Sequence, residues 1–369
     1  MSIGDKSVAK PVRESGIELL RILAACAVVM LHFNGMGGAL SSSSGITHEL
    51  LLMLESLCIG AVDVFIIISG FFLCATMKRT WDKPVYLFFL LSIINVAAFS
   101  LKTIIDGDSL DILHVIHCVF PPQNYFFVLY VTLYIVSPFI NLVLNSLSND
   151  GRTTFIIVLF AIFSIYSFLM DSYQLLVYKK IIGIEEIVGV NPVGAWGSQL
   201  GYTIVGFTLC YSIGAWARLN KVFEYLTRWK WMAYSTICIL LIYFLCKVES
   251  YYYGSFDNAL SYTNPFVVLL SLSFVMLFAK MNFRSRIINS LAKAAFVCYV
   301  FHYRIFPYLD ISNYARSGGL HLFLYYLVLV VAIYFVSWFI WFVLDWVLKP
   351  IVRKLGRYEL FSLAKTDGH

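Results

Sequence analysis

Residues 320–348 read LHLFLYYLVLVVAIYFVSWFIWFVLDWVL and decide the fold class of this 369-residue chain. Between Leu322 and Leu344 this stretch contains no charged residue. A helix needs about 20 mainly apolar residues to cross the hydrocarbon core of a bilayer. The stretch is therefore long enough to span a membrane as one helix, and it predicts an integral membrane protein.

The composition of the whole chain agrees with this prediction. Hydrophobic residues make up 60% of the chain and charged residues 13%, whereas a soluble domain has about 25% charged residues. This argues against a secreted disulfide scaffold, a coiled coil, a disordered tail and a nucleic-acid-binding module. The eight Cys residues indicate no disulfide framework, and we expect no nucleic-acid partner.

Ten segments are long and apolar enough to be spans. They predict an all-α bundle that forms one transmembrane domain over residues 1–369, with spans from about 17 to 348. Basic residues precede the first segment, as in a signal peptide, but the segment itself is charged and we expect it to be retained. The ten segments are 17–34, 51–77, 84–105, 125–146, 153–170, 197–217, 231–247, 264–281, 287–305 and 320–348.

The Lys and Arg residues predict the orientation. With ten spans, 20 of the 27 fall on one side of the membrane and six on the other, while Arg21 lies within a span. Cytoplasmic loops carry the excess of positive charge. We therefore expect a multi-pass protein of the plasma (inner) membrane with both short tails, 1–16 and 349–369, in the cytoplasm. The outer loops are rich in Tyr and Asn, which suit sugars or an interfacial aromatic belt.

The first span carries ionisable residues, each of which costs about 2.5–3.5 kcal/mol near the bilayer centre. Arg21 and His32 share one helix face to within about 20° and lie about 16 Å apart along the axis. Glu18 lies three residues before Arg21 and can pair with it. The spacing predicts a ligand along this face, with anionic groups near Arg21 and a reactive end near His32. Alternatively, Glu18 and Arg21 form an interfacial pair and His32 is an interfacial histidine.

Asp63 interrupts the apolar second segment. A carboxylate buried without a partner is costly, so we expect Asp63 to face a polar cavity or to pair with His32. Such a pair would orient the imidazole ring and stabilise its charged form. Ser69 and Gly70 follow on the same segment, where they alternatively form a packing face of small residues.

These residues resemble the motifs of the membrane acyltransferase-3 family, whose members transfer acyl groups, often acetyl, to cell-surface glycans. The resemblance covers about residues 14–349. In the second motif Ile66 replaces a Phe, and some of the usual arginines after it are lysines. The matching segments are Arg21 to His32 (Arg-x10-His), Val62 to Phe71 (Phe-Phe-x-x-Ser-Gly), the basic stretch Lys78, Arg79, Lys83 and Pro84, the fourth-span pattern from Tyr125 to Asn141, and Tyr299 to His302 (Tyr-x-x-His).

The resemblance implies a membrane-bound O-acyltransferase that moves acetyl from cytoplasmic acetyl-CoA to a hydroxyl of a surface polysaccharide or of its polyprenyl-linked precursor. Its partners would be acyl-CoA, that glycan acceptor and membrane lipids, with no metal. It leaves open a direct transfer or an acetyl-His intermediate, and a monomer or a homodimer. The implied residues are His32 (general base), Asp63, Ser69 and His302 for catalysis; Glu18, Arg21, Lys78 and Arg79 for acyl-CoA; and Tyr125, Tyr130 and Tyr299 for the acceptor.

Other functions fit part of the pattern. Buried charge and outer aromatic residues are also typical of a transporter or flippase of lipid-linked glycans. A glycan polymerase would need long outer loops rich in Arg and His, whereas these loops are short and lean acidic. His114 and His117, with Asp111 nearby, have a spacing that could bind a metal, but histidines in a loop usually do not, and we expect no metal site there.

Overall fold

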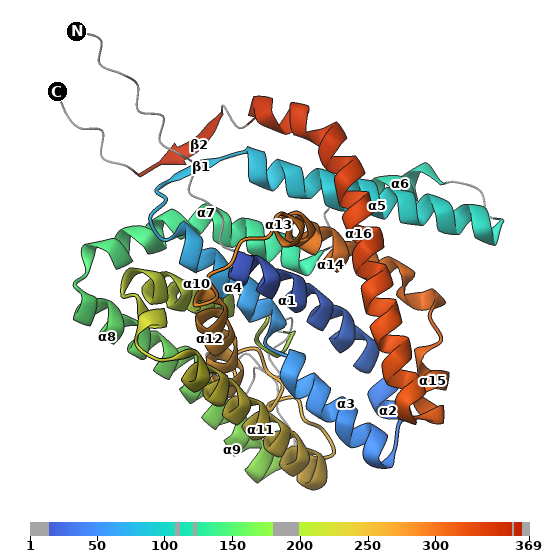
Figure 1. Cartoon of the computed structure of the whole chain (residues 1–369), viewed down its shortest axis with the longest axis horizontal. Helices are drawn as coiled ribbons and strands as arrows, with labels where there is room; N and C mark the ends of the chain where they lie inside the picture. The colour runs from blue at the N-terminus through green and yellow to red at the C-terminus, as the bar shows by residue number, and fades with distance from the viewer. Residues whose placement is uncertain (1–14, 108–110, 121–123, 180–198, 356–357, 364–369) are drawn as a thin grey trace.

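The computed structural model describes residues 15–107, 111–120, 124–179, 199–355 and 358–363 (Figure 1). Within these residues, seven helical segments are long and apolar enough to cross a membrane, and two apolar helices are shorter. The chain is thus a helical, multi-pass membrane protein, as the composition predicts. Of the expected tails 1–16 and 349–369, residues 1–14, 356–357 and 364–369 lie outside the described residues, as does the loop 180–198, whereas residues 349–355 continue α16.

The long segments are α1 (Ser15–Asn34), the pair α3 (Gly45–Cys58) and α4 (Ala61–Leu73), α5 (Asp82–Asp106), α7 (Tyr125–Ser146), the run α8 (Asn149–Phe160), η1 (Ala161–Tyr166) and α9 (Ser167–Tyr178), α11 (Arg228–Tyr253) and α16 (Gly319–Leu355). The shorter apolar helices are α10 (Ile204–Leu219) and α12 (Pro265–Ala279). Between α12 and α16 lie α13 (Arg286–Leu291), η5 (Ala292–Ala294) and α14 (Ala295–Ile305). Short elements complete the described fold: α2 (Ala39–Ser42), β1 (Lys78–Thr80), α6 (Ile112–Val119), η3 (Gln199–Gly201), η4 (Val222–Glu224), η6 (Phe306–Tyr308), α15 (Ile311–Ser317) and β2 (Glu359–Ser362).

Within the described residues three predicted spans are not single uninterrupted helices, and in one of them, 197–217, the short η3 precedes α10, which begins at Ile204. The expected second span, 51–77, begins earlier, at Gly45, and is interrupted at Gly60. There the Ser271 hydroxyl of α12 donates to the Gly60 carbonyl at 3.0 Å, and a Cβ on Gly60 would overlap that hydroxyl. The expected ninth span, 287–305, is divided into α13, η5 and α14. Hydropathy does not report such breaks, because they arise from contacts with other helices.

The helix α1 runs through the middle of the bundle, where it contacts α3, α4, α12, α14 and α16 (Figure 1). Beside it, α4 and α10 pack with their backbones close together. A Cβ on Gly70 would overlap the carbonyl of Tyr211, and a Cβ on Gly214 would overlap the carbonyl of Ile67. Small residues permit this close approach between membrane helices.

Helix ends meet in two groups, one at each end of the bundle. β1 pairs with β2 antiparallel, so the start of α5 lies near the end of α16 (Figure 1). Further contacts of the first group are Ser15 N to Phe283 O at 3.0 Å, Lys280 Nζ to Leu226 O at 2.8 Å and Arg152 Nη1 to Asn220 Oδ1 at 3.1 Å. The second group contains Gly319 N to Thr47 Oγ1 at 3.3 Å, Tyr262 N to Leu200 O at 2.9 Å and Asn258 Nδ2 to Ser172 Oγ at 3.0 Å.

Candidate active site

Two cavities lie along one side of α1. Arg21 lines the first, which we call the Arg21 cavity, and His32 lines the second, which we call the His32 cavity. Tyr299 of α14 lines both. The two α1 residues therefore face the side on which α14 lies, and the wall at Tyr299 separates the spaces next to them.

The Arg21 cavity has a volume of about 400 Å³ and lies between α1, α4, α5, α7, α14 and α16. A lining that combines cations with apolar and aromatic groups suits a ligand that has both anionic and apolar parts. Its cations are Arg21, Lys83 and Lys293, its carboxylates Glu18 and Asp345, and its aromatic residues Phe65, Tyr86, Phe126, Tyr130, Phe296, Tyr299 and Trp341.

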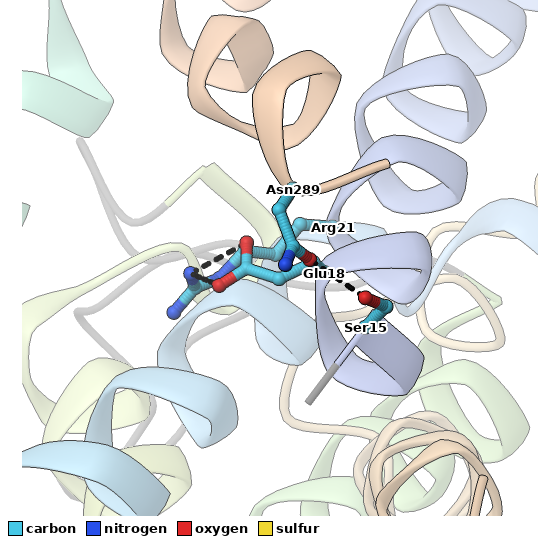
Figure 2. A network of polar contacts seen from close by, with 4 residues as sticks. All are labelled: Ser15, Glu18, Arg21 and Asn289. Atoms are coloured by element: carbon cyan, nitrogen blue, oxygen red, sulfur yellow. Dashed lines mark hydrogen bonds and ion pairs between the residues drawn. The ribbon is translucent and has the colours of Figure 1, made fainter. Parts of the chain in front are cut away.

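Arg21 is held by the carboxylate one turn earlier on its own helix. Its Nη1 donates to both oxygens of Glu18, at 3.0 and 3.1 Å, as Figure 2 shows. Ser15 at the start of α1 donates to Asn289 Oδ1 of α13 at 2.9 Å, which fixes α1 to its neighbour. Glu18 is buried, whereas the Arg21 side chain keeps 27% of its exposure. Arg21 can therefore offer its other guanidinium nitrogens to a ligand, and Glu18 positions it.

The opposite wall of this cavity contains a lysine that is bound to a tyrosine. Lys83 Nζ donates to the Tyr130 hydroxyl at 2.5 Å and lies 4.9 Å from the centre of the Tyr130 ring. Ser69 lines the same cavity and donates to the Phe65 carbonyl at 2.8 Å. Tyr130 and Ser69 thus lie on the Arg21 side, and not beside His32 as their predicted roles in acceptor binding and catalysis would require.

The His32 cavity is larger, about 770 Å³, and its lining is a mixture of polar and aromatic groups. The predicted residues Tyr125, Tyr299 and His302 all contribute to it. The complete lining is His32, Met36, Asn95, Asn124, Tyr125, Val128, Leu129, Tyr299, Val300, His302, Tyr303 and Arg304. Amides, ring faces and a cation that face one space can bind a sugar through hydrogen bonds and stacking.

Two contacts of His32, one with the Val28 carbonyl and one with His302, determine which of its nitrogens carries the proton. His302 Nδ1 lies 2.9 Å from the Cys298 carbonyl, which can only accept, so Nδ1 donates. In the neutral ring the other nitrogen, Nε2, then has a lone pair, and it lies 3.1 Å from His32 Nδ1. His32 Nδ1 also lies 2.8 Å from the Val28 carbonyl and must donate there too.

It follows that the neutral His32 ring carries its proton on Nδ1 and its lone pair on Nε2. Among the described residues, Nε2 has no hydrogen-bond partner. The buried His302, 1% exposed, thus orients a ring that can accept a proton from a ligand in the His32 cavity. A general base needs this combination of a fixed ring and an available lone pair.

The residue that orients His32 is not Asp63, contrary to the prediction. Asp63 is 4% exposed, lies next to Cys210 of α10, and is not part of the lining of either cavity. Its Oδ2 has no hydrogen-bond partner within the part of the chain that the structure describes. Asp63 points toward the α4–α10 interface because it lies on the side of α4 that packs against α10.

Lys78 and Arg79 also lie away from the two linings. Lys78 pairs with Glu359 of β2 at 2.9 Å. Arg79 is 1% exposed, and its guanidinium donates to the Tyr134 carbonyl at 2.8 Å and to the Ser137 hydroxyl at 2.6 Å. The Arg79 donors are engaged within the fold, so its position does not support the predicted role in binding acyl-CoA.

Several polar lining residues were not among the predicted site residues, among them the cations Lys83, Lys293 and Arg304 and the amide Asn95. Lys83 belongs to the basic stretch that resembles the third family motif, but no role was predicted for it. Of the other three, only Arg304 lies on α14, the helix on which the lining residues Phe296, Tyr299 and His302 recur at helical spacing. Asn95 gave no signal, because a single Asn in an apolar span does not reveal which helix it contacts.

The comparisons with known proteins assign the chain to a family. The acyltransferase domain of family 3 matches residues 14–342, which include the whole of α1 and every lining residue of the two cavities except Asp345. No curated protein and no solved structure matches the chain. Since the match covers most of the sequence, this chain belongs to acyltransferase family 3 and is an acyltransferase of the membrane.

Proposed function

We propose that the protein transfers an acetyl group from cytoplasmic acetyl-CoA to a hydroxyl of a cell-surface polysaccharide or of its lipid-linked precursor. The observation that carries this proposal is the contact between His302 Nε2 and His32 Nδ1, at 3.1 Å, in a cavity next to the Arg21 cavity. This contact supports His32 as an oriented base in the His32 cavity. The cations of the neighbouring Arg21 cavity support a site for an anionic donor.

In the reaction, His32 Nε2 accepts the proton of the acceptor hydroxyl while the oxygen attacks the thioester carbonyl carbon. The new C–O bond forms, the tetrahedral intermediate collapses, and the C–S bond breaks. The thiolate of CoA leaves and takes the proton back from His32. The products are the acetyl ester and CoA-SH, and His32 is again neutral.

The donor is assigned to the Arg21 cavity. Arg21, Lys83 and Lys293 favour phosphate groups, and the apolar wall suits a pantetheine arm. A thioester that enters there must pass the wall at Tyr299 to reach His32. Tyr299 is therefore placed to control this passage, and its ring contacts those of Phe126 and His302, at 5.2 and 6.1 Å between centroids.

We infer the orientation in the membrane from the charge bias of the sequence, and the two groups of helix ends agree with it. In the predicted ten-span topology every member of the first group, including β1, β2 and Ser15, would lie on the cytoplasmic side. That side is the Arg21 end of α1. The donor then enters from the cytoplasm, where acyl-CoA is made, and the acceptor reaches His32 from the outer side.

The test is the variant His32→Gln, assayed in proteoliposomes with labelled acetyl-CoA and the host's glycan. We expect transfer to fall by about 10²–10⁴-fold, the usual contribution of a general base, while the thermal stabilisation by acetyl-CoA is retained. His48→Gln is the matched control, since His48 lies outside both linings. Undiminished transfer by His32→Gln would disprove the mechanism.

A further inference from the structure

Arg304 is a cation in the wall of the His32 cavity that has no carboxylate partner within the described residues. Its Nε and Nη2 donate to Asn95 Oδ1, at 3.0 and 2.7 Å. No Asp or Glu contributes to the lining of this cavity as far as the structure describes it. In contrast, Arg21 in the other cavity has Glu18 at 3.0 Å.

Asn95 orients Arg304 but does not neutralise it. Asn95 is 2% exposed, and its Nδ2 donates to the Cys118 carbonyl at 3.3 Å, so the amide oxygen is held toward the guanidinium. A neutral amide leaves the positive charge uncompensated. Arg304 is partly buried, and its charge faces the cavity, where a guanidinium can pair with an anion. Among the described residues its Nη1 has no partner, because the contacts to Asn95 use Nε and Nη2, and this nitrogen is available to such an anion.

The other residues at the mouth of the cavity indicate where the anion would come from. Met36, Tyr125, Val128 and Tyr303 line the cavity and are all exposed large side chains. Val128 is in the first turn of α7, where the proposed topology places the outer membrane interface. The cavity thus opens where an acceptor with a charged group can approach.

We propose that the acceptor carries an oxyanion that pairs with Arg304 while its hydroxyl reaches His32. This inference rests on the proposed function and names its substrate class: an anionic glycan, rather than a neutral one. The oxyanion is either the carboxylate of an acidic sugar or the phosphate that joins a sugar to a lipid. A guanidinium can form paired hydrogen bonds with both.

The experiment compares three acceptors with the purified full-length protein in vesicles. They are an oligosaccharide that contains a uronic acid, the same oligosaccharide with that carboxyl reduced to an alcohol, and a polyprenyl-phosphate-linked sugar. We expect Arg304→Gln to raise KM for at least one anionic acceptor by about 10–100-fold, the equivalent of one hydrogen bond to a charged group. KM for the neutral acceptor and for acetyl-CoA should stay unchanged.

Two further variants complete the experiment, one as a control for charge and one that keeps the charge of Arg304. Lys102→Gln removes an exposed cation of α5 that is not in the lining, and should change none of the KM values. Arg304→Lys keeps the charge and should retain part of the preference, which also covers the case in which Arg304→Gln does not fold.

The outcomes separate the two hypotheses. An effect on the uronic acid alone identifies a carboxylate, and an effect on the polyprenyl phosphate alone identifies a lipid-linked acceptor. If Arg304→Gln changes KM for all acceptors equally, or for none, the inference about the anion is wrong while the acetyl transfer stands. If the wild-type protein acetylates no acceptor and does not bind acetyl-CoA, the proposed function itself fails.

Discussion

At the scale of single residues, the chemistry depends on two histidines from segments far apart in the sequence. His32 has a lone pair available only because Nδ1 is committed to donating, to the Val28 carbonyl at 2.8 Å and toward His302 at 3.1 Å. His302 is in turn fixed by the Cys298 carbonyl. His302 is accordingly a positioning residue in the proposed mechanism, and His32 is the catalytic one.

Replacing His302 by Leu should lower the rate of transfer by about 100-fold, because the His32 ring loses the side chain that fixes it from α14 and keeps only the contact with the Val28 carbonyl. His302→Gln should recover part of this loss, since the amide oxygen can accept from His32 Nδ1. The measurement is kcat for transfer as a function of pH, compared between the wild type and the two variants. Binding of acetyl-CoA, followed by thermal shift, should be unaffected. Equal rates for the Leu and Gln variants would mean that His302 only fills space.

At the scale of helices and strands, the site depends on contacts between elements that lie outside the two cavity linings. The glycines of α4 and α10 allow the two helices to touch. Arg79, which donates to α7 at Tyr134 and Ser137, ties the β1 segment to that helix. These contacts position α4 and α7, both of which contribute residues to the Arg21 cavity.

Gly214→Ala should destabilise the protein by roughly 1–3 kcal/mol, as is typical of an overpacked site, because the new Cβ would overlap the Ile67 carbonyl. The control is Gly35→Ala, where the nearest atom to the new Cβ is the Leu31 carbonyl oxygen at 3.4 Å, an ordinary contact. The measurement is the midpoint of thermal unfolding in detergent. A Gly214→Ala protein as stable as Gly35→Ala would show that the helices can separate without cost.

At the scale of the whole molecule, the two cavities divide the proposed reaction between the two sides of the membrane. The Arg21 cavity would bind the donor and the His32 cavity the acceptor, with Tyr299 in the wall between them. A transporter of lipid-linked glycans would have no use for a donor site that binds acyl-CoA.

Acetyl-CoA should therefore stabilise the wild-type protein, by about 2.7 kcal/mol at a concentration of 100 times Kd. Lys293→Gln, in the wall of the Arg21 cavity, should weaken this effect, whereas His32→Gln should retain it. The control is Lys230→Gln, an exposed cation at the start of α11. The measurement is the shift in the thermal unfolding midpoint that acetyl-CoA produces. If the wild type shows no such shift, the transporter is favoured. If the shift is lost in His32→Gln but retained in Lys293→Gln, the assignment of the two cavities is reversed.

The helical membrane fold could be predicted from the sequence because hydropathy and length are local properties. The spans 17–34, 84–105 and 125–146 agree closely with α1, α5 and α7. The breaks at Gly60 and at η5 could not be predicted in the same way, since α12 approaches Gly60 through Ser271, a residue 211 positions away.

The separation of Arg21 and His32 along α1 was predictable from helix geometry alone, because both belong to one regular element. Which residue orients His32 was not predictable, and the choice of Asp63 was wrong. Asp63 and His302 are both ionisable residues in apolar segments, but only the packing of α14 against α1 brings His302 Nε2 to 3.1 Å from His32 Nδ1.

The amino-acid sequence by itself therefore determined that the chain enters a membrane, that it carries ionisable groups in its first span, and that these groups share one side of a helix. Each of these depends on neighbours in sequence. The tertiary structure decided which groups meet: His302 with His32, Asn95 with Arg304, and Arg79 with the backbone of α7 instead of a cavity. The physical reason is that a hydrogen bond requires two groups within about 3 Å, and in a helical bundle only the packing of distant segments sets that distance.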